Sequence, residues 1–245
     1  MPRFFAAGGT VAGGVAFITG EDAQHARVLR LRVGDRLVVC DGAGQDHHCR
    51  VTKMGEDTLE AEVLETEVSP AEPGVRVTVL CGFPKGERAD YIVQKCTELG
   101  MAELVFFFCE RCVARPDRAS MGRKLARFQR IAEEAAKQSG RGVIPIVRAA
   151  EDFGAALDIA VKTQLPLFFY ETGARLPLRR ALEEADSPRT VALLTGPEGG
   201  FAEHEAKLAE LAGMRLCSLG PRILRCETAP VAALTALMFA TGNMD

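Results

Sequence analysis

The sequence predicts an α/β protein whose mostly parallel sheet follows a small β-rich domain. From residue 75 onward, short apolar runs alternate with helical patterns, as in chains whose parallel strands are joined by helices. Before residue 69 the apolar runs are short and are separated mainly by turn residues. Between these parts, residues 69–74 are rich in proline and glycine, which is typical of a linker. We therefore expect two domains, 1–72 and 73–245.

The first domain is expected to be a small β-barrel with one helical turn. A helix is expected near 22–29 and a turn at 41–44. The last strand pattern alternates polar and apolar residues, as a half-exposed strand does. The strand patterns of this domain lie at 15–18, 36–40, 48–52 and 58–64.

The second domain is expected to be a parallel sheet with helices on both faces, because strands and helices alternate along it. Gly100 is expected to end its first helix. The expected strands are 75–81, 104–108, 144–147, 165–170, 191–195 and 216–219. The expected helices are 87–99, 120–139, 153–162, 176–185, 203–211 and 230–241.

The composition is that of an ordinary globular protein. Of the 245 residues, 47% are hydrophobic and 26% are charged, and we expect neither a transmembrane span nor a signal peptide. The eight cysteines show no spacing typical of a disulfide scaffold, which favours a reducing, cytoplasmic location.

Positive charge is concentrated in the middle third of the chain. Residues 73–150 hold 14 basic and 8 acidic residues, although the whole chain carries a net charge of −3. Several of these cations fall on one stripe of the expected helix 120–139 or close to it. A solvated charged face is the simpler interpretation, but we favour a surface that contacts phosphates. The arginines concerned are Arg123, Arg127, Arg130 and Arg141.

The expected last helix, 230–241, has almost no polar face. Such a helix must be buried on both sides. It could lie in the centre of the core, but at a chain end we favour burial against a second copy of the chain, as in a homodimer.

Metal binding and nucleophilic catalysis are poorly supported. Cys109-x-x-Cys112 is one cysteine pair, whereas a structural zinc site needs four ligands, so we expect no metal. The group 47–49, His-His-Cys, does not complete one. The chain has no Gly-x-Ser-x-Gly elbow, and neither a phosphate-binding P-loop nor a dinucleotide glycine motif follows a strand.

Two loops carry the strongest functional signal. Residues 195–201 and 219–229 each follow an expected strand and precede a helix. Loops at the carboxyl edge of a parallel sheet commonly form a ligand crevice, and glycines let the backbone approach a ligand closely. The alternative is two ordinary turns with surface charges. Their polar groups are Glu198, Arg222, Arg225 and Glu227.

These loops closely resemble those of the RsmE family, the bacterial 16S ribosomal RNA uridine-N3 methyltransferases of the SPOUT class. The matching motifs are Gly-Pro-Glu-Gly-Gly-Phe at 196–201 and Leu-Gly-Pro-Arg-Ile-Leu-Arg-Cys-Glu-Thr-Ala at 219–229. Further matches at 2–5, 25–35, 85–100 and 138–145 extend the resemblance over nearly the whole chain.

The resemblance implies a PUA-like β-barrel that binds RNA and a SPOUT-type α/β domain with a deep trefoil knot at about 165–230. It further implies a homodimer that binds S-adenosylmethionine in the knotted loops and acts on the 16S rRNA of the small ribosomal subunit. The implied donor-binding residues are Thr195, Gly196, Pro197, Gly199, Gly200, Leu219, Gly220, Ile223, Leu224, Thr228 and Ala229.

Methyl transfer to uridine N3 requires loss of a proton and stabilisation of the negative charge on the uracil oxygens. We expect Arg225 to stabilise that charge and Glu198 or Glu227 to accept the proton. Both glutamates could equally orient the loops or contact the donor. The arginines expected to hold the RNA are Arg3, Arg30 and Arg32 in the barrel with Arg123, Arg127, Arg130 and Arg141.

Three residues depart from the family pattern. Cys112 replaces an expected serine and Lys137 an expected glutamate. Ala202 cannot cap the next helix as serine or threonine would, a loss of about 1 kcal/mol unless it is compensated. Three other functions stay open: a knotted methyltransferase acting on tRNA or another rRNA position, a non-catalytic RNA-binding protein and a small-molecule α/β enzyme.

Overall fold

The computed structural model describes residues 1–5, 11–172 and 175–244. The chain forms two compact units. One comprises Met1–Glu72 with Ala136–Ile144, and the other comprises Pro73–Ala135 with Pro145–Asp245. The short segment 136–144 therefore belongs with the N-terminal unit, although it lies in the middle of the sequence.

The first unit is built on a six-stranded sheet in the order β1-β4-β5-β6-β3-β2. Strand β1 pairs in parallel with β4, and the other neighbouring strands are antiparallel. Phe4, Leu37, Val39 and Leu59 are fully buried in its core. The elements are β1 (Arg3–Phe5), β2 (Val11–Ala12), β3 (Val15–Thr19), α1 (Glu21–Val28), β4 (Arg36–Cys40), β5 (Gln45–Met54) and β6 (Thr58–Val68).

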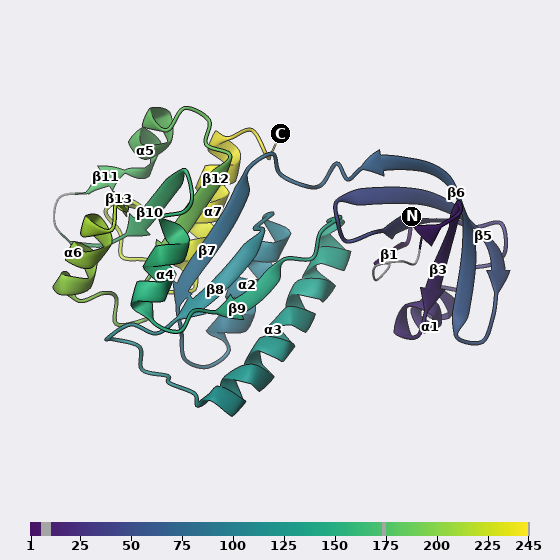
Figure 1. Ribbon diagram of the computed structural model, residues 1–245, viewed down its shortest axis with the longest axis horizontal. Helices are drawn as coiled ribbons and strands as arrows, with labels where there is room; N and C mark the ends of the chain where they lie inside the picture. Colours follow the sequence, from purple (N-terminus) through teal and green to yellow (C-terminus); the bar gives the residue numbers. More distant parts are fainter. Residues whose placement is uncertain (6–10, 173–174, 245) are drawn as a thin grey trace. The chain divides into compact units, whose positions relative to one another are not determined.

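The second unit is an α/β layer structure on a seven-stranded sheet in the order β11-β13-β10-β12-β7-β8-β9 (Figure 1). Every neighbouring pair in this sheet is parallel. Its strands are β7 (Arg76–Gly82), β8 (Glu103–Phe107), β9 (Ile146–Ala149), β10 (Leu165–Phe169), β11 (Leu176–Pro177), β12 (Thr190–Thr195) and β13 (Arg215–Ser218). Its helices are α2 (Arg88–Glu98), α3 (Arg118–Ser139), α4 (Phe153–Ala160), α5 (Leu178–Glu184), α6 (Glu203–Leu211) and α7 (Thr228–Ala240).

The sheet is buried on both faces. Successive residues of a strand point to opposite sides of the sheet, and each side packs against a hydrophobic core. In β12, Val191 and Leu193 belong to one hydrophobic core, whereas Ala192 and Leu194 belong to the other. Helices α2, α3, α5 and α7 cover the first core, and α4 and α6 cover the second. The expected α/β class with helices on both faces of a parallel sheet is confirmed.

Proline explains the main differences from the expected boundaries. The expected helix 176–185 begins with the short strand β11, because Leu176 precedes Pro177 and a residue before proline avoids helical geometry. Likewise β9 starts at Ile146, directly after Pro145. The strand β1 was not expected, since three residues are too few to show a pattern, but Phe4 buries its side chain there.

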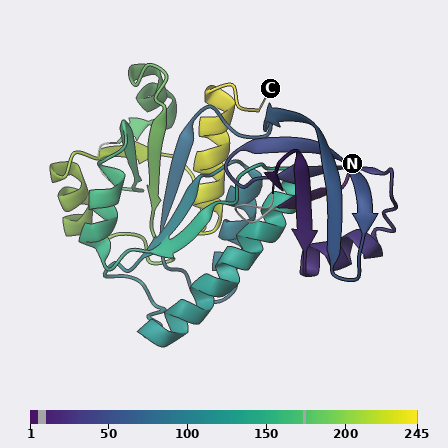
Figure 2. The ribbon, with the colours of Figure 1, turned by 45° about the vertical axis from the view of Figure 1, so that its right-hand side comes forward.

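Helix α7 lies along the sheet beside β12 and β7 and also contacts α2 (Figure 2). Its inner residues, among them Leu234 and Leu237, are fully buried, whereas Phe239 is 72% exposed. One apolar face of the helix is therefore uncovered in the single chain. Within the described residues, no helix is long and apolar enough to cross a membrane.

Candidate functional site

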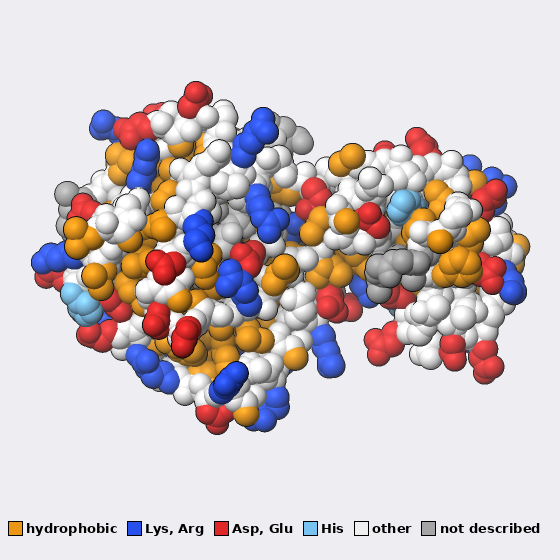
Figure 3. Space-filling model, in the orientation of Figure 1, with side chains coloured by type: hydrophobic (Ala, Val, Ile, Leu, Met, Phe, Trp, Pro, Cys, Tyr) orange, Lys and Arg blue, Asp and Glu red, His pale blue; other side chains and the backbone are white. Residues whose placement is uncertain are grey.

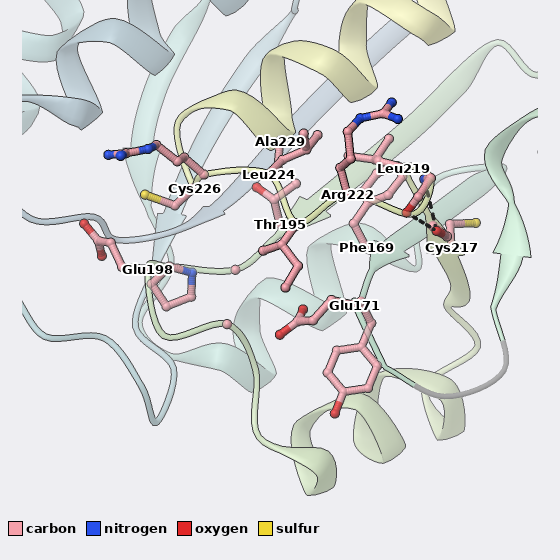
Figure 4. Close-up of a pocket in the computed structure, with 18 of the residues that line it drawn as sticks. Phe169, Glu171, Thr195, Glu198, Cys217, Leu219, Arg222, Leu224, Cys226 and Ala229 are labelled. Atoms are coloured by element: carbon pink, nitrogen blue, oxygen red, sulfur yellow. Dashed lines mark hydrogen bonds between the residues drawn. The ribbon is translucent and has the colours of Figure 1, made fainter.

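A pocket of about 440 Å³ lies at the carboxyl ends of three adjacent strands of the second unit. Glu171 follows β10, the loop 195–201 follows β12, and the loop 219–229 follows β13. Because these strands are parallel neighbours, their carboxyl ends meet at one edge of the sheet. In Figure 4, Glu198 and Cys226 lie at one end of the pocket, Leu219 and Cys217 at the other, and Thr195 between them.

The pocket brings together most of the residues singled out in the sequence. Glu198, Arg225 and Glu227 line it, and so do all the expected donor-binding residues except Gly199 and Thr228. Thr228 lines a neighbouring surface depression instead. Gly199 packs against the side chain of Arg111, on the outer side of the loop.

Three charged lining residues, Glu171, Arg88 and Arg175, are not among those expected from the sequence. Glu171 lines the pocket directly after the expected strand 165–170, and its place at the carboxyl end of a strand was a usable signal. Arg88, at the start of α2, lines it as well. No motif points to Arg88, because its partners lie more than a hundred positions further along the chain.

Arg88 bridges the two carboxylates. Its Nη1 donates to Oε1 of Glu198 at 2.6 Å, and its Nε lies 3.3 Å from Oε2 of Glu227. The backbone N–H of Lys85 donates to the same oxygen of Glu198 at 2.9 Å. One cation from α2 thus joins the loop after β12 to the loop after β13.

Both glutamates are held in the ionised form. Burial raises the pKa of Glu198, but hydrogen bonds from the Lys85 backbone and from Arg88 outweigh it, so the pKa lies below that of an ordinary glutamate. Burial also raises the pKa of Glu227. Hydrogen bonds from its own backbone and from Cys226, with the positive charges of Arg88 and Arg225, bring that pKa below the ordinary value.

The loop 195–201 is fixed by its neighbours. Phe201 is buried, and its ring lies 4.4 Å, centroid to centroid, from that of Phe168. Gly200 has φ +63°, and a Cβ placed there would lie 2.5 Å from Oε1 of Glu171. The backbone conformation therefore favours glycine at this position, and a side chain here would displace the carboxylate of Glu171.

The missing cap at Ala202 is compensated. Oε2 of the buried Glu205 accepts the backbone N–H of Ala202 at 2.9 Å, which is the reaching-back half of a capping box. Oε1 of Glu205 accepts the N–H of Glu110 at 2.8 Å. One carboxylate thus joins the start of α6 to the loop that follows β8.

The last residues of the loop 219–229 form the start of helix α7. The carbonyl of Arg225 accepts the N–H of Thr228 at 2.9 Å and that of Ala229 at 3.0 Å, while its side chain is exposed. Cys226 donates from Sγ to Oε2 of Glu227 at 3.2 Å. Burial and this hydrogen bond raise the pKa of Cys226 to about 12, so it is a neutral thiol.

The arginines expected to hold RNA fall into two groups. Arg3 is bound to Asp46 by two hydrogen bonds of 2.8 and 2.7 Å, and Arg141, only 3% exposed, is paired with Glu72 at 2.7 Å. The other arginines are exposed, although Arg127 pairs with Asp90 at 2.6 Å. The exposed group is Arg30, Arg32, Arg123, Arg127 and Arg130.

On the face shown in Figure 3, basic side chains of the second unit are mixed with acidic and apolar ones rather than gathered into one patch. No group of three or more metal-ligating side chains occurs within the described ranges. Lys137, where a glutamate was expected, pairs with Asp22 at 2.9 Å.

The chain matches known RNA-modifying proteins along both units. Residues 71–238 match the family described as RNA methyltransferase domain, and residues 18–64 match the RNA methyltransferase PUA domain. The chain is 34% identical over 230 residues to the ribosomal RNA small subunit methyltransferase E of Bacillus subtilis, covering 91% of this chain and 90% of the relative. It is 36% identical to the Synechocystis protein of the same name, covering 86% of this chain and 68% of that one.

The structure is similar to a solved ribosomal RNA small subunit methyltransferase E from Neisseria gonorrhoeae bound to S-adenosyl methionine. The TM-score is 0.84 at 31% sequence identity, with 98% of this chain and 97% of the other covered.

Proposed function

The chain belongs to the ribosomal RNA small subunit methyltransferase E family and is an S-adenosylmethionine-dependent methyltransferase of 16S rRNA; from this premise we propose that it methylates N3 of a uridine. The observation that carries the proposal is the pocket that the two loops enclose, with Arg88 and Arg225 beside two ionised glutamates. The PUA-like N-terminal domain and the SPOUT-type α/β domain follow from the same family membership.

The pocket fits the methyl donor. Its volume of about 440 Å³ lies in the range of small-molecule sites, and its glycines leave backbone groups accessible. The carboxylate of Glu171 points into the pocket (Figure 4) and can face the cationic sulfur, whereas Glu198 and Glu227 are paired with Arg88. We propose that the expected donor-binding residues hold S-adenosylmethionine here, with Glu171 as an additional lining residue. When bound, this donor supplies a methyl group activated by its positively charged sulfur.

We propose that Arg225 stabilises the negative charge that the uracil oxygens gain as N3 loses its proton. Its side chain is exposed at the pocket, where it can contact a base. Glu198 and Glu227 are ionised, so either can accept a hydrogen bond or a proton from N3. Their low pKa values make them weak bases. We propose that both glutamates also orient Arg88.

The acceptor base has a candidate place beside the donor pocket. A depression lined by Lys85, Gly86, Glu87, Tyr91 and Thr228 shares Arg88 and Glu227 with that pocket. Tyr91 is 46% exposed, which makes its ring available for stacking on a flipped-out base. We propose that the target uridine stacks on Tyr91, with its N3 edge toward Glu227, which lines both the depression and the pocket and is influenced by the charge of Arg225.

Subunit organisation and RNA binding complete the proposal. The homodimer is supported by two apolar surfaces, the uncovered face of α7 with Phe239 and the side chain of Ile223, which is 87% exposed. Two copies of the chain can bury these side chains against each other.

We propose that the exposed arginines 30, 32, 123, 127 and 130 contact RNA phosphates, whereas Arg3 and Arg141 hold the first unit together through their ion pairs. We further propose a cytoplasmic protein with a knot at about 165–230, and with the domains 1–72 for RNA and 73–245 for methyl transfer, of which the segment 136–144 packs with the first.

Transfer of labelled methyl from S-adenosylmethionine to small subunits, large subunits, bare rRNA and tRNA tests the substrate. The proposal predicts label in small-subunit RNA alone. Label in tRNA or in the large subunit would replace this substrate, and the absence of label from every RNA despite donor binding would point to a binding protein.

A further inference from the structure

Two cysteine thiols, those of Cys109 and Cys112, lie in the turn that follows β8, and this turn contacts the loop 195–201. The N–H of Cys112 donates to the carbonyl of Cys109 at 3.2 Å, which closes a β-turn. The two Sγ atoms are 3.6 Å apart. Cysteines that close a β-turn have Cα atoms less than about 7 Å apart, a separation that a disulfide can span. The side chains are almost buried, at 3% and 6% exposure for Cys109 and Cys112.

The turn favours a thiolate on Cys112. Its Sγ is in hydrogen-bond contact with the thiol of Cys109 and accepts the backbone N–H of Cys109 at 3.4 Å. Arg115 lies beside the turn and donates to the carbonyl of Cys109 at 2.6 Å. The hydrogen bond from the Cys109 thiol lowers the pKa of Cys112, and backbone N–H groups with the charge of Arg115 lower it further, against the opposing effect of burial. A thiolate is the form of cysteine that attacks an oxidant.

The two residues between the cysteines, Glu110 and Arg111, are connected to the second half of the loop 195–201 and to the start of α6. Nη1 of Arg111 donates to the carbonyl of Gly199 at 3.3 Å, and the Arg111 side chain packs against that glycine. The N–H of Glu110 binds Glu205, whose other oxygen binds the N–H of Ala202. A change in the geometry of the turn therefore acts directly on the segment 199–202.

We propose that Cys109 and Cys112 are a redox-active dithiol, which a peroxide converts to a disulfide that weakens binding of S-adenosylmethionine. The Cys112 thiolate attacks one peroxide oxygen, forming a sulfenic acid and releasing water after protonation. The Cys109 thiol then attacks that sulfur, the S–S bond forms, and a second water leaves. Two thiols are oxidised by two electrons, and one peroxide is reduced to two waters.

Formation of the bond brings the two sulfurs from 3.6 Å to about 2.05 Å, so the cysteine side chains and the turn that carries them must adjust. We expect this adjustment to shift Glu110 and Arg111 and to perturb their contacts with Glu205 and Gly199. Formation of the disulfide stands on the geometry of the turn alone, whereas its effect on the donor rests on the proposed function.

Two assays on the full chain separate these steps. After treatment with hydrogen peroxide, mass spectrometry of the peptide containing 109–112 is expected to show the loss of two hydrogen atoms, reversed by dithiothreitol. Calorimetric titration is expected to show about a two- to tenfold weaker Kd for S-adenosylmethionine after oxidation, the range that loss of one hydrogen bond produces.

Matched variants assign the effect to this pair. All eight cysteines are free, and Cys217 and Cys226 line the donor pocket. Cys112→Ser keeps a side-chain oxygen in the turn and is expected to bind the donor equally with and without peroxide. Cys226→Ser, compared with its own reduced form, is expected to keep the sensitivity.

Peroxide treatment that leaves 109 and 112 as thiols, or takes one of them to sulfinic acid without a disulfide, would overturn the proposal. So would a complete disulfide with unchanged donor affinity. If the untreated protein does not bind S-adenosylmethionine at all, the proposed function fails, whereas the disulfide result still decides the redox step.

Discussion

Arg88 and Glu198 are 110 positions apart in the chain, yet Nη1 of Arg88 donates to Oε1 of Glu198 at 2.6 Å. Nε of the same arginine lies 3.3 Å from Glu227. The arginine begins α2, and the two glutamates come from the loops after β12 and β13. The cation of Arg88 thus contacts a carboxylate of each loop, so we regard it as the residue that keeps both loops in place.

Arg88→Ala is expected to lower turnover about ten- to hundredfold, since a hydrogen bond to a charged group contributes about 1.5–3 kcal/mol. Steady-state kinetics with small subunits measures this. Arg180→Ala removes an arginine from an exposed pair with Glu184 and is the matched control, expected to have little effect. Equal turnover of the two variants would contradict the bridging role.

Arg225→Ala is expected to lower turnover at least about a hundredfold, as loss of a group that stabilises an oxyanion does, while changing the donor Kd less than about threefold. The backbone carbonyl of residue 225, which starts α7, is kept in the variant. Turnover and calorimetric Kd are measured side by side, with Arg222→Ala as a control for the general positive charge of the loop. An equal loss of donor affinity and turnover would refute the assignment.

The fold and the two loops could be predicted because their signals are local. Apolar periodicity gives the strands and helices, and the loops 195–201 and 219–229 are contiguous motifs. Arg88 could not be found in this way, since its role depends on which strands become neighbours in the sheet, whereas the place of Glu171 directly after an expected strand was a usable signal. The pairing of Arg141 with Glu72 is equally non-local. The sequence alone therefore does not show that Arg141 is buried in an ion pair rather than available to contact RNA.

Stability is expected to depend on the ionised form of Glu198. Its pKa is below the ordinary value, so its stabilising effect is complete above about pH 4.3 and is lost as the pH falls through the lower pKa of the folded protein. Urea unfolding should therefore show Glu198→Gln less stable than the native chain at pH 7, with the difference shrinking below about pH 4. The exposed Glu151→Gln serves as a control. A difference that does not change with pH would contradict this account.

Gly200→Ala is expected to weaken donor binding about tenfold or more, since it places a side chain at φ +63° and against Glu171, at a cost of about 1–3 kcal/mol in backbone strain. Gly122→Ala is the control, because its added Cβ meets nothing within 4 Å and lies in helix α3. Calorimetry with S-adenosylmethionine compares the two. Normal affinity in Gly200→Ala would show that the loop tolerates rearrangement.

Tyr91→Ala is expected to lower kcat/KM for the RNA about tenfold or more, because base–aromatic stacking is worth about 1–3 kcal/mol. Tyr91→Phe keeps the ring and is expected to retain most of the activity. The donor Kd should be unchanged in both variants, since Tyr91 lines the neighbouring depression and not the donor pocket. A Phe variant as impaired as the Ala variant would exclude stacking as the main contribution.

The position of the transferred methyl group tests the central claim most directly. Small subunits are incubated with the protein and labelled S-adenosylmethionine, their 16S rRNA is digested, and the labelled nucleoside is identified by mass spectrometry. The account predicts N3-methyluridine, at one site, and its loss in Arg225→Ala. Label in a methylated ribose, or in any base other than uracil, would contradict the proposed site chemistry.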